Sequence, residues 1–184
     1  MLKKIAQLTL LLGLLGTSLT SCGTVAPAKA PDGGSLLSTA KGRTYGRVIV
    51  QNFRNTSGNS EPAAEAAPRM LANKLQNELL RLKPSAAILS EGKPDADTLV
   101  VSGNITRFVE GSAALRFWVG MGAGSSYFDA TLRVTDGSGK HLGTINADKN
   151  SWGLGGAIAA GQTVETFMDE TARKSAQQLV PLVR

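Results

Sequence analysis

A chain of 184 residues is long enough for one domain with a sizeable core and too short for two comfortable ones. Its formal net charge of +6 comes from basic residues spread singly, without basic runs or interleaved aromatic residues, so the pattern disfavours a nucleic-acid partner. The chain has a single cysteine, so no intrachain disulfide forms and stability must come from packing.

The first residues have the pattern of an export signal. Lys3 and Lys4 precede an apolar run over 5–15, and small and hydroxyl residues follow up to Cys22. A membrane-spanning helix needs roughly 20 apolar residues, so this run is too short to be one. We therefore interpret residues 1–21 as a signal peptide.

The tetrad Leu19-Thr20-Ser21-Cys22 resembles the lipobox of bacterial lipoproteins. The resemblance implies that the Cys22 thiol carries diacylglycerol, that the preceding peptide is removed, and that the new amine is acylated. The alternative is an ordinary secretory signal with a chance cysteine. Each buried CH₂ contributes about 0.8 kcal/mol, so several acyl chains anchor a protein firmly without a spanning segment.

Gly23 follows the cysteine at a position where many inner-membrane lipoproteins carry aspartate. In a cell with two membranes, the resemblance implies sorting to the outer membrane, with the domain facing the periplasm. The mature chain keeps 18 basic and 14 acidic residues, a charge of +4, because Lys3 and Lys4 leave with the signal.

Residues 22–43 are expected to be a flexible tether. The stretch is rich in Ala, Gly, Pro and Ser and has no hydrophobic period. Leu36-Leu37 interrupts it, which suggests a short contact with the domain. A single periplasmic α+β domain over 44–184 follows.

The first part of this domain has the pattern strand, helix, strand. A β-branched run predicts a strand over 47–53, and a short strand is expected over 86–89. Between them, apolar residues at helical spacing predict a helix over 66–83: Ala67, Leu71, Leu75, Leu79 and Leu82. Pro68 either lies in the first turn of that helix or kinks it.

The stretch 99–147 predicts three strands joined by glycine-marked turns. Residues 127–135 alternate between apolar and polar, which is typical of a strand with one solvated face. The turn Asp136-Gly137-Ser138-Gly139 predicts an antiparallel hairpin, and a change of parity predicts a bulge near Gly143.

The last segment predicts an amphipathic helix over 163–182 with Thr163 as its N-cap. Its apolar face holds eight residues at helical spacing: Val164, Phe167, Met168, Thr171, Ala172, Ser175, Leu179 and Leu182. The expected fold is α+β, a mostly antiparallel sheet of about five strands with two amphipathic helices on one face.

Three segments, 103–108, 120–125 and 134–140, resemble a family of bacterial lipoproteins known as domain-of-unknown-function family 4410. The resemblance runs from about Gly46 to Val183. It implies a compact α+β periplasmic domain, similar to accessory lipoproteins of outer-membrane export and surface-assembly systems. No activity is established for the family.

No residue set indicates a reaction. Gly120, Gly122 and Gly124 lack the following helix that a phosphate loop requires, because 125–128 begins a strand. His141 is the only histidine, so any zinc site or catalytic triad would have to include it. Neither a metal site nor a cofactor is predicted. The aspartates are scattered, and one sequence leaves a paired-carboxylate site open.

Phe117, Trp118, Val119 and Met121 form an aromatic and apolar cluster among glycines. The cluster either covers the sheet face that the helices leave free or contacts another protomer or an envelope partner.

The sequence favours a membrane-anchored, non-enzymatic accessory or assembly component of the cell envelope or of an export system. Two alternatives stay open: a tethered hydrolase that uses carboxylates, and a module that binds anionic glycans or lipids through its arginines. A cleft with two carboxylates about 5–10 Å apart would favour the enzyme.

Overall fold

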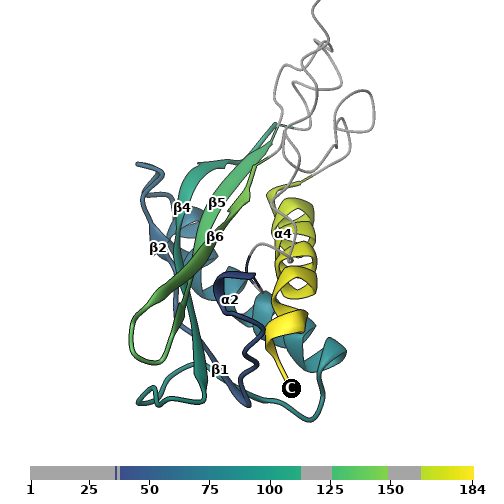
Figure 1. Cartoon of the computed structure of the whole chain (residues 1–184). Coiled ribbons are helices and arrows are strands. Elements are labelled where there is room, and N and C mark those ends of the chain that lie inside the picture. Colours follow the sequence, from purple (N-terminus) through teal and green to yellow (C-terminus); the bar gives the residue numbers. More distant parts are fainter. Residues whose placement is uncertain (1–35, 37, 113–125, 149–162) are drawn as a thin grey trace, which may run out of the picture.

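The computed structural model describes residues 36, 38–112, 126–148 and 163–184. Its strands and helices follow in the order β1 (Arg47–Val50), β2 (Arg54–Asn55), α2 (Pro62–Leu82), β3 (Ala87–Leu89), β4 (Thr98–Val109), β5 (Tyr127–Asp136), β6 (His141–Ala147) and α4 (Val164–Leu179), with a 3₁₀ turn at Val180–Leu182. The sheet forms one layer and the two helices form the other (Figure 1). The expected α+β fold class is confirmed.

The sheet has the strand order β3-β1-β4-β5-β6, with β2 also pairing with β4. The long strands β4, β5 and β6 are antiparallel, whereas β1 runs parallel to β3 and β4, and β2 runs parallel to β4. Parallel strands need a crossover connection, and α2 supplies it between β1 and β3. The sheet is thus mixed, and its largest part is antiparallel as expected.

The strand predicted over 47–53 is divided in two. Val50 pairs with Val101, and Arg54 pairs with Asn104. The stretch from Val50 to Arg54 is one residue longer than the stretch from Val101 to Asn104, so one of its residues has no partner on β4. Phe53 lies in this interruption and turns into the core. It packs on Gly103, where an added Cβ would lie 2.8 Å from the Phe53 ring. A continuous strand would keep Phe53 from this position.

The hairpin between β5 and β6 is confirmed. The Asp136 carboxylate accepts hydrogen bonds from the Ser138 amide at 2.9 Å, the Ser138 hydroxyl at 2.6 Å and the Lys140 amide at 3.0 Å. Gly139 has a φ of +87°, a conformation that favours glycine. The register shifts where Val134 faces Gly143 and Thr135 faces His141, which is the expected bulge.

Helix α2 begins at Pro62, four residues before the predicted start. Proline suits the first helical position because the amide N–H at that position has no acceptor within the helix, so its absence costs no hydrogen bond. Pro68 therefore lies buried inside the helix, and the interpretation that it marks the first turn is wrong. In α4 the Thr163 hydroxyl accepts a hydrogen bond from the Thr166 amide at 3.3 Å, so the predicted N-cap is confirmed.

The core lies between the helices and one face of the sheet. The eight predicted apolar-face positions of the last helix are all buried, and so are Leu71, Leu75 and Leu79 of α2. The buried core residues of the sheet are Val48, Val50, Leu99, Val101, Ile105, Phe108, Phe128, Ala130, Leu132, Val134, Leu142 and Ile145. The predicted burial of both helices on one sheet face is confirmed.

The stretch assigned to the tether contributes to this core at its end. Leu36 and Ala40 are both buried, and Leu36 lies over Gly143, where an added Cβ would be 2.3 Å from the leucine side chain. The contact expected from the Leu36-Leu37 pair is present at Leu36. Leu36 and Ala40, within the stretch 22–43, thus belong to the packed core.

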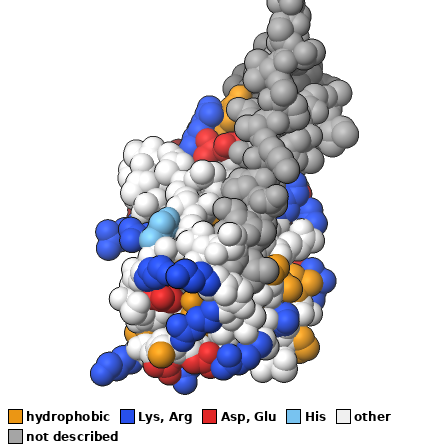
Figure 2. Space-filling view, viewed as in Figure 1, with side chains coloured by type: hydrophobic (Ala, Val, Ile, Leu, Met, Phe, Trp, Pro, Cys, Tyr) orange, Lys and Arg blue, Asp and Glu red, His pale blue; other side chains and the backbone are white. Residues whose placement is uncertain are grey.

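The opposite sheet face carries no helix within the described ranges, and we call it the open face. Polar side chains at alternate positions of β4 and β5 share it, among them Ser102, Asn104, Thr131 and Arg133. In the space-filling view, basic and acidic side chains intermingle on the visible surface (Figure 2). Within the described part of the chain, no helix is long and apolar enough to cross a membrane.

Candidate functional site

The site residues predicted from the sequence lie outside the described ranges. These are the lipidation site Cys22 and the proposed contact residues Phe117, Trp118, Val119 and Met121. The glycines Gly120, Gly122 and Gly124 lie outside them as well. Among the described residues, the side chains that remain as candidates for a site are the carboxylates, the histidine and the arginines.

His141 lies exposed on β6, the edge strand of the sheet. Its Nε2 atom is 3.3 Å from the Thr144 hydroxyl. No group of three metal-ligating side chains occurs in the described ranges.

Two aspartates before β4 form ion pairs with arginines from distant parts of the domain. Asp95 binds Arg47 at 3.1 Å, and Asp97 binds Arg184 at 2.7 Å. The pKa of Asp95 is lowered, first by the hydrogen bond from the Thr98 hydroxyl and then by the Asp97 amide, so its carboxylate stays charged. The two ion pairs thus link the loop before β4 to β1 and to Arg184.

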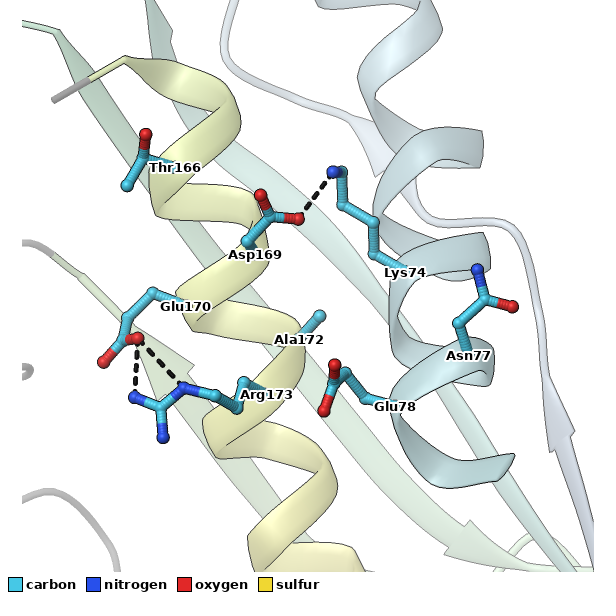
Figure 3. A pocket seen from close by; sticks show the side chains of 8 residues that line it. All are labelled: Lys74, Asn77, Glu78, Thr166, Asp169, Glu170, Ala172 and Arg173. Atoms are coloured by element: carbon cyan, nitrogen blue, oxygen red, sulfur yellow. Dashed lines mark hydrogen bonds and ion pairs between the residues drawn. The ribbon is translucent and has the colours of Figure 1, made fainter. Parts of the chain in front are cut away.

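A first hollow of about 430 Å³ lies between α2 and α4 and is lined by Glu78, Asp169 and Glu170 among others (Figure 3). The Lys74 ammonium bridges the helices, 2.5 Å from Asp169 and 3.4 Å from Glu165. Two arginines bind the other acids along their own helices, Arg81 to Glu78 at 2.7 Å and Arg173 to Glu170 at 2.6 Å. We call this the helix hollow.

The electrostatics of the helix hollow do not suit acid–base catalysis. Burial alone would raise the pKa of Glu170, but hydrogen bonds from Arg173 and Lys174 outweigh it and lower the pKa. The pKa of Lys74 is raised, chiefly by its hydrogen bond to Asp169. A general acid needs a carboxyl group whose pKa is raised, and ion pairing works against this. Lys74 thus joins the two helices through Asp169 and Glu165, whereas the arginine pairs lie within single helices.

A second hollow of about 310 Å³ lies on the open face, and we call it the sheet hollow. Its lining comes from the β1–β2 connection, β2, β4 and β5: Gln51, Asn52, Arg54, Ser102, Gly103, Asn104 and Arg133. Among the described residues that line it are two arginines, three amides and one hydroxyl, and none of them is acidic. Sequence reasoning missed this site because its residues are scattered over 83 positions, and only strand pairing brings them together.

The sheet and the two helices define a two-layer α+β domain. The chain belongs to the family described as a domain of unknown function, DUF4410, whose sequence profile matches residues 37–155. No curated protein matches this sequence.

Two solved structures are similar to this chain at low identity. One is a dodecamer of a single-residue variant of PelC from Paraburkholderia phytofirmans, with a TM-score of 0.49 and 14% identity, covering 77% of this chain and 90% of that one. The other is a PelC dodecamer from the same organism, with a TM-score of 0.48 and 13% identity, covering 77% of this chain and 91% of that one.

Proposed function

We propose that this chain is a lipid-anchored protein of the bacterial cell envelope whose domain docks to envelope partners and catalyses no reaction. Acyl chains on Cys22 hold it in the outer membrane, facing the periplasm. The observation that carries the proposal is the tetrad Leu19-Thr20-Ser21-Cys22 directly after an export signal. The only cysteine of the chain stands where the cleavage site belongs.

The arrangement of the charged groups supports docking over hydrolysis. The acids of the helix hollow, Glu78, Asp169 and Glu170, are each engaged by a basic side chain. A hydrolase that works through carboxylates needs one of them protonated near neutral pH. The lowered pKa of Glu170 is contrary to that requirement.

The anchor is tested by changing Cys22→Ala in the full chain, expressed in a bacterium with two membranes. Without the thiol no diacylglycerol is attached, so we expect an unprocessed precursor or a protein in the soluble fraction. Wild-type protein should incorporate labelled palmitate and partition into detergent. The measurements are membrane fractionation, palmitate labelling and the mass of the mature N-terminus.

Ser21→Ala is the matched control, because it keeps a small residue before the cysteine and should leave processing and partition unchanged. Wild-type mature protein found soluble with a free thiol would contradict the proposal.

A further inference from the structure

The arginines of this domain fall into two groups. Nine lie in the described ranges, and six have a partner there, through an ion pair, a hydrogen bond or an aromatic ring: Arg43, Arg47, Arg81, Arg107, Arg173 and Arg184. Arg54, Arg69 and Arg133 have none in the part of the chain that the structure describes. Two of these three, Arg54 and Arg133, line the sheet hollow. The fold thus gathers guanidinium groups that its own acids leave unneutralised.

Strand pairing places these two arginines on opposite sides of β4. Arg54 of β2 pairs with Asn104, and Arg133 of β5 pairs with Ser102. Neighbouring strands lie about 4.8 Å apart, so β2 and β5 are separated by about 10 Å across β4. This separation suits an extended ligand with more than one negative group better than a single small anion.

The side chains between the arginines are uncharged hydrogen-bonding groups. Gln51, Asn52, Ser102 and Asn104 make no side-chain hydrogen bond within the described residues, and Ser102 and Asn104 are half-buried. Amides and hydroxyls both donate and accept, so they match the hydroxyl groups of a sugar, which do the same. The volume of about 310 Å³ is at the lower end for ligand sites.

We propose that the sheet hollow binds an acidic oligosaccharide, a sugar chain that carries carboxylates. Arg54 and Arg133 hold carboxylates of neighbouring units, because the planar guanidinium donates two parallel hydrogen bonds to a carboxylate. Asn104, Ser102 and the amides of the β1–β2 connection bind the hydroxyls between them. This assignment goes beyond the proposed function, since it requires neither the acyl anchor nor a protein partner.

The test is calorimetric titration of the full chain, purified in nonionic detergent, with tetragalacturonate at low salt. We expect saturable binding with a dissociation constant below about 1 mM. Arg54→Gln and Arg133→Gln should each weaken it at least tenfold, and the double variant should abolish it. Asn104→Ala should weaken it severalfold. The neutral tetrasaccharide maltotetraose should bind at least tenfold more weakly than the acidic one.

Arg69→Gln is the matched control, because Arg69 is also exposed and without a partner in the described ranges but lies on α2, in the other layer. It removes the same charge and should leave the affinity unchanged. Unchanged thermal denaturation of each variant shows that its loss of binding is local. If Arg133→Gln fails to fold, the affinity of Arg54→Gln, a change on the short strand β2, decides the test.

Three results would overturn the inference. If tetragalacturonate does not bind, the inference is wrong. Equal weakening by Arg69→Gln would show a general effect of net charge. Inorganic phosphate that binds as tightly as the tetrasaccharide and displaces it would show a site for single anions. None of these results would affect the membrane partition through which the anchor is tested.

Discussion

At the scale of single residues, the turn between β5 and β6 depends on one carboxylate. Asp136 accepts three hydrogen bonds from Ser138 and Lys140, which close the turn. Its pKa is lowered from the ordinary value of 3.8, chiefly by the bond from the Ser138 hydroxyl. The folded state therefore favours the charged carboxylate more strongly than the unfolded chain does.

This lowered pKa predicts a pH dependence of stability. A group with a lowered folded-state pKa stabilises the fold above its unfolded value, and the contribution is lost as the pH falls from about 3.8 through the folded value. Asp136→Ala should cost about 1–2 kcal/mol at pH 7, because buried or turn-closing hydrogen bonds contribute about that much. Urea unfolding at pH 7 and at pH 3 checks this, and the difference from wild type should shrink at pH 3.

Asp136→Asn serves as the control, since it keeps an acceptor oxygen and loses only the charge-dependent part of the stabilisation. If Asp136→Ala lowers the free energy of unfolding equally at both pH values, the stabilisation does not come from the charged carboxylate.

At the scale of elements, the packing of α2 on α4 and the sheet dominates stability. Leu75 and Phe167 are buried in the shared core, whereas Arg173 is partly exposed and binds Glu170 of its own helix. Leu75→Ala and Phe167→Ala should each destabilise by about 2–5 kcal/mol, because they remove apolar burial and leave a cavity. Arg173→Ala should stay within about 0.5 kcal/mol, as for most surface changes.

Chemical denaturation of the three variants measures these differences. Equal and small effects at all three positions would mean that the helix faces assigned to the core are not the ones that stabilise the fold.

At the scale of the whole molecule, the sequence leaves two roles for Phe117, Trp118, Val119 and Met121: they cover the sheet face that the helices leave free, or they contact another protomer or an envelope partner. Tryptophan and methionine are enriched at the centres of interfaces, and truncating a central aromatic residue often costs about 2 kcal/mol or more. If the cluster is a contact, Trp118→Ala should therefore weaken assembly by roughly 30-fold while it barely changes the melting of the monomer.

Sedimentation of the full chain over a range of concentrations, together with thermal melting, measures both effects. Trp152→Ala, the other tryptophan of the chain, is the matched control and should leave assembly unchanged. A large loss of monomer stability with unchanged assembly would assign Trp118 to the core instead.

Local patterns in the sequence are sufficient for most elements of this fold. The period of the last helix, its Thr163 cap and the Asp136 turn act within a few residues, so their physical causes are visible in the sequence itself. The same holds for the alternation along β5 and for the bulge near Gly143. Helix α2 begins four residues before its predicted start at 66, because Pro62 starts it as a first helical residue.

Which distant residues become neighbours in the sheet depends on the tertiary structure alone. Nothing local indicates that β1 pairs in parallel with β4, that Phe53 leaves the strand to pack on Gly103, or that Leu36 lies over Gly143. The sheet hollow has the same origin, since Arg54 and Arg133 are 79 positions apart in the sequence and become neighbours only across β4. The sequence by itself determined most of the elements and their buried faces, because these depend on contacts between near neighbours. Pairing between distant strands determined the binding surface, because its register depends on the packing of the whole core.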